Sequence, residues 1–184
     1  MIKWLGQCFV LLGLISVLSV TGCLSRHSIL TPTQFSQVLP AFNYKAYYLT
    51  YTDNQQQEMH ASLVIKQDVT HNNSEWLIFN PLGMPLARKQ LTDKGWANKG
   101  FIAPNTQMDH WLEVMLFSLT DEKSLSQNYP QAIHSLKTRY LGSEYIITYQ
   151  PNIITIDWNN GNKLHMKEAL QIMVYLSALG LNCA

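Results

Sequence analysis

Hydrophobic residues change their spacing along the chain. They first form one continuous uncharged run, CFVLLGLISVLSV at residues 8–20. From Tyr44 they alternate with polar residues and include many aromatic and β-branched side chains, which is typical of strands. Short polar turns separate these segments, so the pattern predicts an antiparallel meander with strands at residues 44–51, 58–66, 75–79, 85–91 and 96–102.

A helix is predicted to follow the meander, near residues 106–120. Thr106 is suited to cap its start. The apolar residues then recur at the helical period on one broad face: Trp111, Leu112, Met115, Leu116 and Leu119. Such a face needs cover from the rest of the domain. Residues 121–135 are predicted to be irregular, with a short helical turn after Pro130.

The last third of the chain returns to strands. Residues 144–150 and 152–158 carry strand-like patterns. Asn159-Asn160-Gly161-Asn162 predicts a tight hairpin turn, because Asn and Gly accept positive φ angles. Residues 163–176 fit either a strand or a helix, and the hairpin before them favours a strand over their first half.

The apolar run at the N-terminus has the features of a secretion signal. Lys3 precedes it, and the run is shorter than the roughly 20 residues that span a bilayer. It leads into Val20-Thr21-Gly22-Cys23, which matches the bacterial lipobox. An ordinary secretory signal or a core helix with a chance cysteine are the alternatives. The positive charge, the apolar run, the small residues and the cysteine follow one another in the order of a lipoprotein signal. This order predicts a lipoprotein signal peptide at residues 1–22, with Cys23 as the lipidated residue.

Lipidation would make the membrane a partner of the chain. Two acyl chains suffice for stable anchoring, and a mature lipoprotein cysteine carries three. Leu24 follows the cysteine where Asp would favour inner-membrane retention. The resemblance to Gram-negative lipoproteins therefore implies the outer membrane, facing the periplasm. Residues 23–43 are predicted to be the lipidated N-terminus and a tether with one helical turn, followed by a single domain at residues 44–184.

Charge and cysteine content exclude several classes of function. Lys3 leaves with the signal, so the thirteen basic residues become twelve, against twelve acidic residues. This balance, with no basic patch, argues against nucleic acid as a partner. Cys8 also leaves and Cys23 is consumed by lipid, so Cys183 has no partner for an internal disulfide. It is either a free thiol or an intermolecular link.

Catalytic and cofactor motifs are missing from the sequence. The six histidines form no HExxH pattern, and neither a G-x-S-x-G elbow nor a glycine-rich phosphate loop is present. The sequence therefore predicts no metal, no cofactor and no enzymatic activity. Asp109, His110 and Glu113 would fit an acid–base cluster, but a solvated first helical turn is the favoured interpretation. Glu144 and Asp157 are interpreted as outward-facing polar residues.

One segment resembles a known family. Residues 76–86 (WLIFNPLGMPL) combine an apolar strand, an Asn-Pro-Leu-Gly turn and a return strand. This hairpin resembles the outer-membrane lipoprotein receptor LolB and is closer still to DUF3261, a family of small predicted outer-membrane lipoproteins. The likeness continues through Lys94-Gly95-Trp96 and into the helix from Thr106, which is about half of the mature chain.

The resemblance implies an α+β fold, in which a curved antiparallel sheet forms an incomplete β-barrel with a helical lid. In LolA- and LolB-like proteins the cavity accepts acyl chains, and a LolA-like carrier would be a partner. DUF3261 members are also associated with gene clusters for aryl-polyene or fatty-acid-like products. The predicted order of elements is compatible with this fold, but other packings of a sheet and a helix fit it equally.

Aromatic and apolar residues are the candidates for ligand binding. Six aromatic side chains either line a cavity for an apolar ligand or fill the core: Tyr47, Tyr51, Trp76, Trp96, Phe101 and Trp111. Leu82 and Met84 flank Gly83 at the hairpin tip. They either touch a membrane or an acyl chain, or tuck beneath the helix.

Two functions fit these features. The first is a lipid-anchored, non-enzymatic protein that binds or transfers a hydrophobic or acylated cargo, such as a lipid, a lipoprotein or an aryl-polyene-like product. The alternative is a structural or assembly lipoprotein that acts through protein contacts in the cell envelope.

The lipidation site is directly testable. Cys23→Ala removes the thiol that accepts diacylglycerol, so the chain should carry no lipid. Intact-mass spectrometry of the wild-type protein and the variant would measure the added lipid mass. A wild-type mass without lipid would contradict the prediction.

Overall fold

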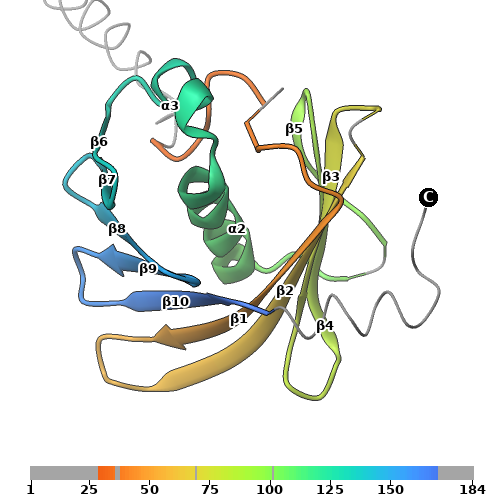
Figure 1. Cartoon of the computed structure of the whole chain (residues 1–184). Helices are drawn as coiled ribbons and strands as arrows, with labels where there is room; N and C mark the ends of the chain where they lie inside the picture. Colours follow the sequence, from red (N-terminus) through yellow and green to blue (C-terminus); the bar gives the residue numbers. More distant parts are fainter. Residues whose placement is uncertain (1–28, 36–37, 69, 101, 170–184) are drawn as a thin grey trace, which may run out of the picture.

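A computed structural model of the chain describes residues 29–35, 38–68, 70–100 and 102–169. The predicted signal peptide, Cys23, Phe101, Cys183 and residues 170–176 lie outside this part. Ten antiparallel strands form one sheet (Figure 1). In sheet order they are β5 (Gly95–Asn98), β4 (Pro85–Thr92), β3 (Asn73–Phe79), β2 (Glu58–Asp68), β1 (Tyr44–Thr52), β10 (Lys163–Glu168), β9 (Ile153–Trp158), β8 (Tyr145–Gln150), β7 (Thr138–Leu141) and β6 (Ala132–His134).

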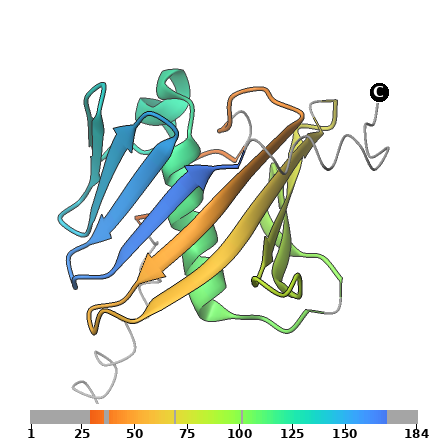
Figure 2. The same ribbon diagram turned by 60° about the horizontal axis from the view of Figure 1, so that its bottom comes forward.

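The sheet consists of two meanders that meet in its middle. Strands β1–β5 form the first meander and β6–β10 the second, and β1 pairs with β10, where Leu49 lies opposite Met166. Two helices, α2 (Thr106–Leu119) and α3 (Glu122–Asn128), connect the meanders. The sheet curves around α2, which lies on its concave side (Figures 1 and 2).

Alternation of side chains along the strands creates the concave core. In β1, Tyr47 and Leu49 are buried while Tyr48 between them is 44% exposed. Leu63 and Ile78 on β2 and β3 continue the buried row that begins at Tyr47. This period of two is what places one face of each strand against the helix.

Helix α2 is apolar on nearly all sides. Asn105, rather than the predicted Thr106, caps its start by accepting hydrogen bonds from the backbone N–H groups of Gln107 and Met108. Eight of its residues are buried, and each of them is at most 2% exposed: Met108, Trp111, Leu112, Val114, Met115, Leu116, Phe117 and Ser118. A helix with this composition is stable only when it is covered on most of its circumference.

The predicted α+β fold, an incomplete β-barrel with a helical lid, is wrong. The described chain is 47% strand and 15% helical, so it is an open ten-stranded antiparallel sheet with two short helices and is closer to all-β. A lid needs one polar face toward solvent, whereas α2 is buried on most of its surface. The helix therefore fills the concave space and does not cover an empty one.

Local differences from the predicted elements lie mainly between α2 and β8. The segment predicted to be irregular contains α3, which ends before Pro130, and β6. Strand β7 was not predicted, and the fifth strand ends at Asn98 instead of continuing to residue 102. The predicted strand over the first half of residues 163–176 is confirmed by β10.

The segment before β1 belongs to the packed domain from Ile29 onward. Leu30 and Val38 are each 1% exposed, and no helical turn is present at the described residues of 29–40. The Thr33 N–H donates to the backbone oxygen of Asn128 at 2.9 Å, and the Asp121 N–H donates to that of Val38 at 2.8 Å. These bonds fix this end of the predicted tether against α3.

Burial of α2 predicts a large effect of truncating its central tryptophan. Trp111→Ala should lower the free energy of unfolding by about 3–5 kcal/mol, because it opens a cavity in the core. Leu136→Ala, at a side chain that is 91% exposed, should change it by less than about 0.5 kcal/mol. Urea unfolding followed by circular dichroism measures both values, and equal effects would contradict the buried position of Trp111.

Candidate functional site

The C-terminal end of α2 is held by two side chains from the second meander. The last carbonyl groups of a helix lack partners within the helix, and α2 has no basic residue in its last turn. Arg139 on β7 supplies the cation: its Nη1 donates to the Thr120 oxygen at 2.8 Å and also lies within 3.3 Å of the Phe117 oxygen. The Tyr149 hydroxyl donates to the Ser118 oxygen at 2.7 Å.

Strand alternation explains why Arg139 reaches the helix. Arg139 and the fully buried Leu141 lie on the concave face of β7, while Tyr140 between them points outward. The guanidinium carbon of Arg139 lies 5.1 Å from the centre of the Tyr149 ring, so the cation is stacked on an aromatic face. The guanidinium is therefore fixed in position from two sides.

A cleft of about 330 Å³ opens beside this helix end. Its apolar wall comes from the helix end and from strands β1, β8, β9 and β10: Tyr47, Leu119, Tyr149, Ile153, Ile154 and Met166. Five charged residues border it: Lys45, Asp121, Glu122, Arg139 and Glu168. The cleft thus combines an apolar wall with a charged rim.

The electrostatics of the cleft leave Arg139 as a half-buried cation. Among the described residues, no carboxylate lies within ion-pair distance of its guanidinium, whose hydrogen bonds go to carbonyl oxygens. Burial raises the pKa of Tyr149 above its usual value, and Arg139 partly opposes this shift. Burial, followed by the charge of Glu168, also raises the pKa of Tyr47. Both phenols are therefore neutral at physiological pH.

A second hollow of about 180 Å³ adjoins the cleft. The two share Glu122, Arg139 and Tyr149, and the second hollow is completed by His134 at the end of β6 and by Ser135 and Leu136 in the β6–β7 turn. The guanidinium of Arg139 consequently borders both spaces.

The acidic cluster at the start of α2 is a half-buried structural feature. Lys89 on β4 lies 2.6 Å from an Asp109 carboxylate oxygen. Burial raises the pKa of Glu113, with Asp109 adding to the shift and Lys89 opposing it. The interpretation as a solvated first turn therefore needs correction, because these side chains pack against the sheet. No group of three or more metal-ligating side chains occurs among the residues described.

His110 serves as a hydrogen-bond acceptor in this region. The indole Nε1 of Trp158 lies 2.9 Å from His110 Nε2 and donates to it, so this nitrogen is unprotonated. Burial lowers the pKa of His110, while the nearby Glu144 opposes the shift. On the outer face, Asp157 pairs with Lys163 at 3.0 Å.

The structure does not bring the predicted ligand-binding residues together. Tyr47 borders the cleft. Four others pack in the aromatic core: Tyr51 and Trp111 with ring centres 4.8 Å apart, and Trp76 and Trp96 5.2 Å apart. Leu82 and Met84 lie at the β3–β4 tip, 82% and 54% exposed, away from the helix. Phe101 lies outside the described residues.

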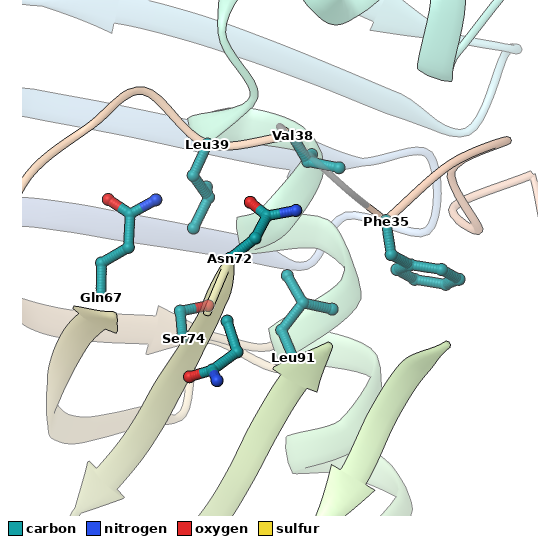
Figure 3. Close-up of a pocket in the computed structure, with 8 residues that line it drawn as sticks. Phe35, Val38, Leu39, Gln67, Asn72, Ser74 and Leu91 are labelled. Atoms are coloured by element: carbon teal, nitrogen blue, oxygen red, sulfur yellow. The ribbon is translucent and has the colours of Figure 1, made fainter. Parts of the chain in front are cut away.

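A third hollow lies between the N-terminal segment and the first meander. Figure 3 shows it between Phe35 and Leu39 on one side and Ser74 and Leu91 on the other. Its volume of about 20 Å³ has room for one water molecule. It is too small to be a ligand site.

Sequence reasoning missed most of the cleft. Arg139 lies on a four-residue strand that the hydrophobic pattern did not indicate. Tyr149 and Ile154 were within predicted strands, but no local signal shows that they meet the end of α2. The strand pairing β1–β10 was the missing information, since it brings Lys45 and Tyr47 to the second meander.

Comparison with known proteins gives no assignment. No protein-family model matches the chain, and no curated protein sequence matches it. Neither described helix is long and apolar enough to cross a membrane.

The buried His110 predicts a pH dependence of stability. As pH falls below about 6.5, the unfolded chain takes up a proton at this histidine before the folded chain does, so the free energy of unfolding should fall. His110→Gln should reduce this loss.

The effect of Glu113 on the pH dependence of stability has the opposite sign, because its raised pKa makes the folded state bind the proton first. Glu113→Gln should therefore steepen the loss of stability as pH falls. Urea unfolding at pH 7.5, 5.5 and 4.5 measures these slopes, the Glu113 effect being expected at the acid end, above the ordinary carboxyl pKa of 4.5. An unchanged slope in both variants would contradict the assignment.

Proposed function

We propose that this protein is a lipid-anchored, non-enzymatic binding protein that holds an anionic amphipathic molecule, such as an acylated carboxylate or phosphate, in the cleft at the end of α2. The observation that carries the proposal is the half-buried Arg139 at the border of a cleft that has one apolar wall. Cys23 and the likeness to DUF3261 support a location at the outer membrane.

The apolar wall of the cleft suits a short stretch of hydrocarbon. Leu119, Ile154 and Met166 face a space of about 330 Å³, which is near the lower end of small-molecule sites. The core behind it is filled by α2, so a long acyl chain would extend outward. The proposal therefore needs no hollow barrel.

Arg139 is the part of the rim that suits an anionic group, while Asp121, Glu122 and Glu168 border the cleft elsewhere. Arg139 uses Nη1 for the carbonyl groups of α2, and no hydrogen bond joins its Nε or Nη2 to another described residue. Those nitrogens carry the donors that bind a carboxylate or phosphate in pairs. Because the helix end fixes the guanidinium, little side-chain entropy would be lost on binding.

The charge of Arg139 can be tested with a matched pair of ligands. Dodecanoate should bind the wild-type protein more tightly than dodecanol. Arg139→Gln should weaken dodecanoate binding about tenfold or more while leaving dodecanol binding nearly unchanged, because only the charged head needs the guanidinium. Arg139→Lys should retain part of the preference for the anion.

Isothermal titration calorimetry measures these affinities. Arg88→Gln is the control, since Arg88 lies on the outer face of β4 and pairs with Glu75. A thermal melt of each variant checks that α2 remains capped. Equal losses for dodecanoate and dodecanol in Arg139→Gln, or no binding of either by the wild type, would contradict the proposal.

A further inference from the structure

The outer face of the second meander carries an exposed apolar row at the sheet edge. Ile133 on β6 lies opposite Tyr140 on β7, which lies opposite Ile146 on β8. These side chains are 71%, 41% and 42% exposed, and Leu136 in the adjoining β6–β7 turn is 91% exposed. We call these four residues the β6–β8 apolar surface.

This surface contrasts with the middle of the same face. There polar pairs occupy much of the outward face, since Thr50 lies 3.4 Å from a ring nitrogen of His60 and Thr155 lies 3.0 Å from one of His165, and Tyr48 is the large apolar side chain exposed among the described residues of β1, at 44%. The fold gains no stability from exposing these four apolar side chains. Adjoining exposed apolar residues of this kind mark contact surfaces.

The attachment of the N-terminal segment identifies what can cover this surface. The backbone oxygen of Ile29 accepts a hydrogen bond from Gln131 at 3.2 Å, and the Ile29 side chain packs beside Gly142. Gln131 immediately precedes β6. Cys23 is six residues before Ile29, so even a fully extended chain places it within roughly 20 Å of this point. Gln131 and Gly142 lie at the base of the short β6–β7 hairpin, and Leu136 lies in the turn at its other end. A lipid attached at Cys23 would hold this hairpin near the bilayer.

We propose that the β6–β8 apolar surface rests on the lipid bilayer that holds the acylated N-terminus, with Leu136 entering the headgroup boundary. The proposal depends on the lipidation of Cys23, which is part of the proposed function. Lys137 follows Leu136 and is exposed, so its ammonium group can reach lipid phosphates while Leu136 faces the acyl region.

The other exposed hairpin tip lies at the far end of the domain. The Phe35 ring packs against Gly95, where an added Cβ atom would lie 3.2 Å from the ring. Gly95 is the first residue of β5 and pairs with Thr92 at the end of β4. Leu82 lies in the turn before β4, and the eight residues of this strand separate its two ends by roughly 26 Å. Phe35 and the β3–β4 turn are therefore at opposite ends of β4, and Figure 1 shows the segment before β1 and the β3–β4 turn on opposite sides of the domain.

The same orientation would place the cleft near the membrane. Leu136 borders the second hollow together with Arg139 and Tyr149. An amphipathic molecule leaving the bilayer beside the β6–β7 turn would thus enter the hollow that the guanidinium borders.

Site-specific fluorescence on the full lipoprotein tests the contact. Leu136→Cys and Leu82→Cys, each in a Cys183→Ser background, are labelled with a polarity-sensitive dye. The proteins are reconstituted into vesicles of phosphatidylethanolamine and phosphatidylglycerol. The dye at residue 136 should shift to the blue and lose intensity when the lipids carry a nitroxide on the acyl chain, while the dye at residue 82 should show neither change. Ile133→Cys provides a second probe of the surface.

Each outcome decides between the proposals. A lipidated, vesicle-bound protein whose dye at residue 136 remains in water overturns this inference and leaves dodecanoate binding at the cleft unaffected. A dye that is shielded but not quenched by nitroxide lipids indicates a second copy or another protein, and it also overturns the inference. A chain without lipid at Cys23 overturns both the anchor and the bilayer contact.

Discussion

Burial of α2 is the constraint on which the rest of the structure depends. A helix with apolar residues around most of its circumference cannot be covered by one flat sheet, which contacts a single side. The two meanders solve this by pairing through β1 and β10 and curving around the helix. The curvature of the sheet and the burial of its concave face thus both follow from the need to cover a helix that is apolar on most sides.

The same constraint determines where a ligand can bind. Because Trp111, Met115 and their neighbours fill the concave space, little room is left beside the body of the helix. The helix ends at Leu119, short of the edge of the sheet, and its free carbonyl groups require a cation there. Arg139 meets that requirement, and the space beyond the helix end becomes the cleft. The structural role and the proposed binding role therefore converge on one guanidinium.

The sequence predicted elements wherever their periodicity was long. Strands β1, β2, β4 and β8–β10 and helix α2 follow from alternating or helical patterns that extend over six or more residues, and the five residues 75–79 predict β3. Strands β6 and β7, with three and four residues, are too short to show a period, and their pairing depends on partners far along the chain. Whether aromatic residues such as Trp76 and Trp111 line a cavity or fill a core depends on the position of α2. The position of α2 depends on tertiary packing, which no local pattern in the sequence shows.

The exposed side chains of the two short strands acquire a meaning only when the attachment of the N-terminus is considered. Ile133 and Leu136 would be a liability on a freely diffusing domain, because exposed apolar residues at a sheet edge favour aggregation. On a domain tethered through Cys23, whose chain joins the fold beside Gln131, the same residues face the surface that the tether holds close. A lipid at Cys23 would supply most of the affinity, so the apolar surface would have only to orient the domain. A small surface is sufficient for orientation, and it would keep Arg139 at the height of the lipid headgroups.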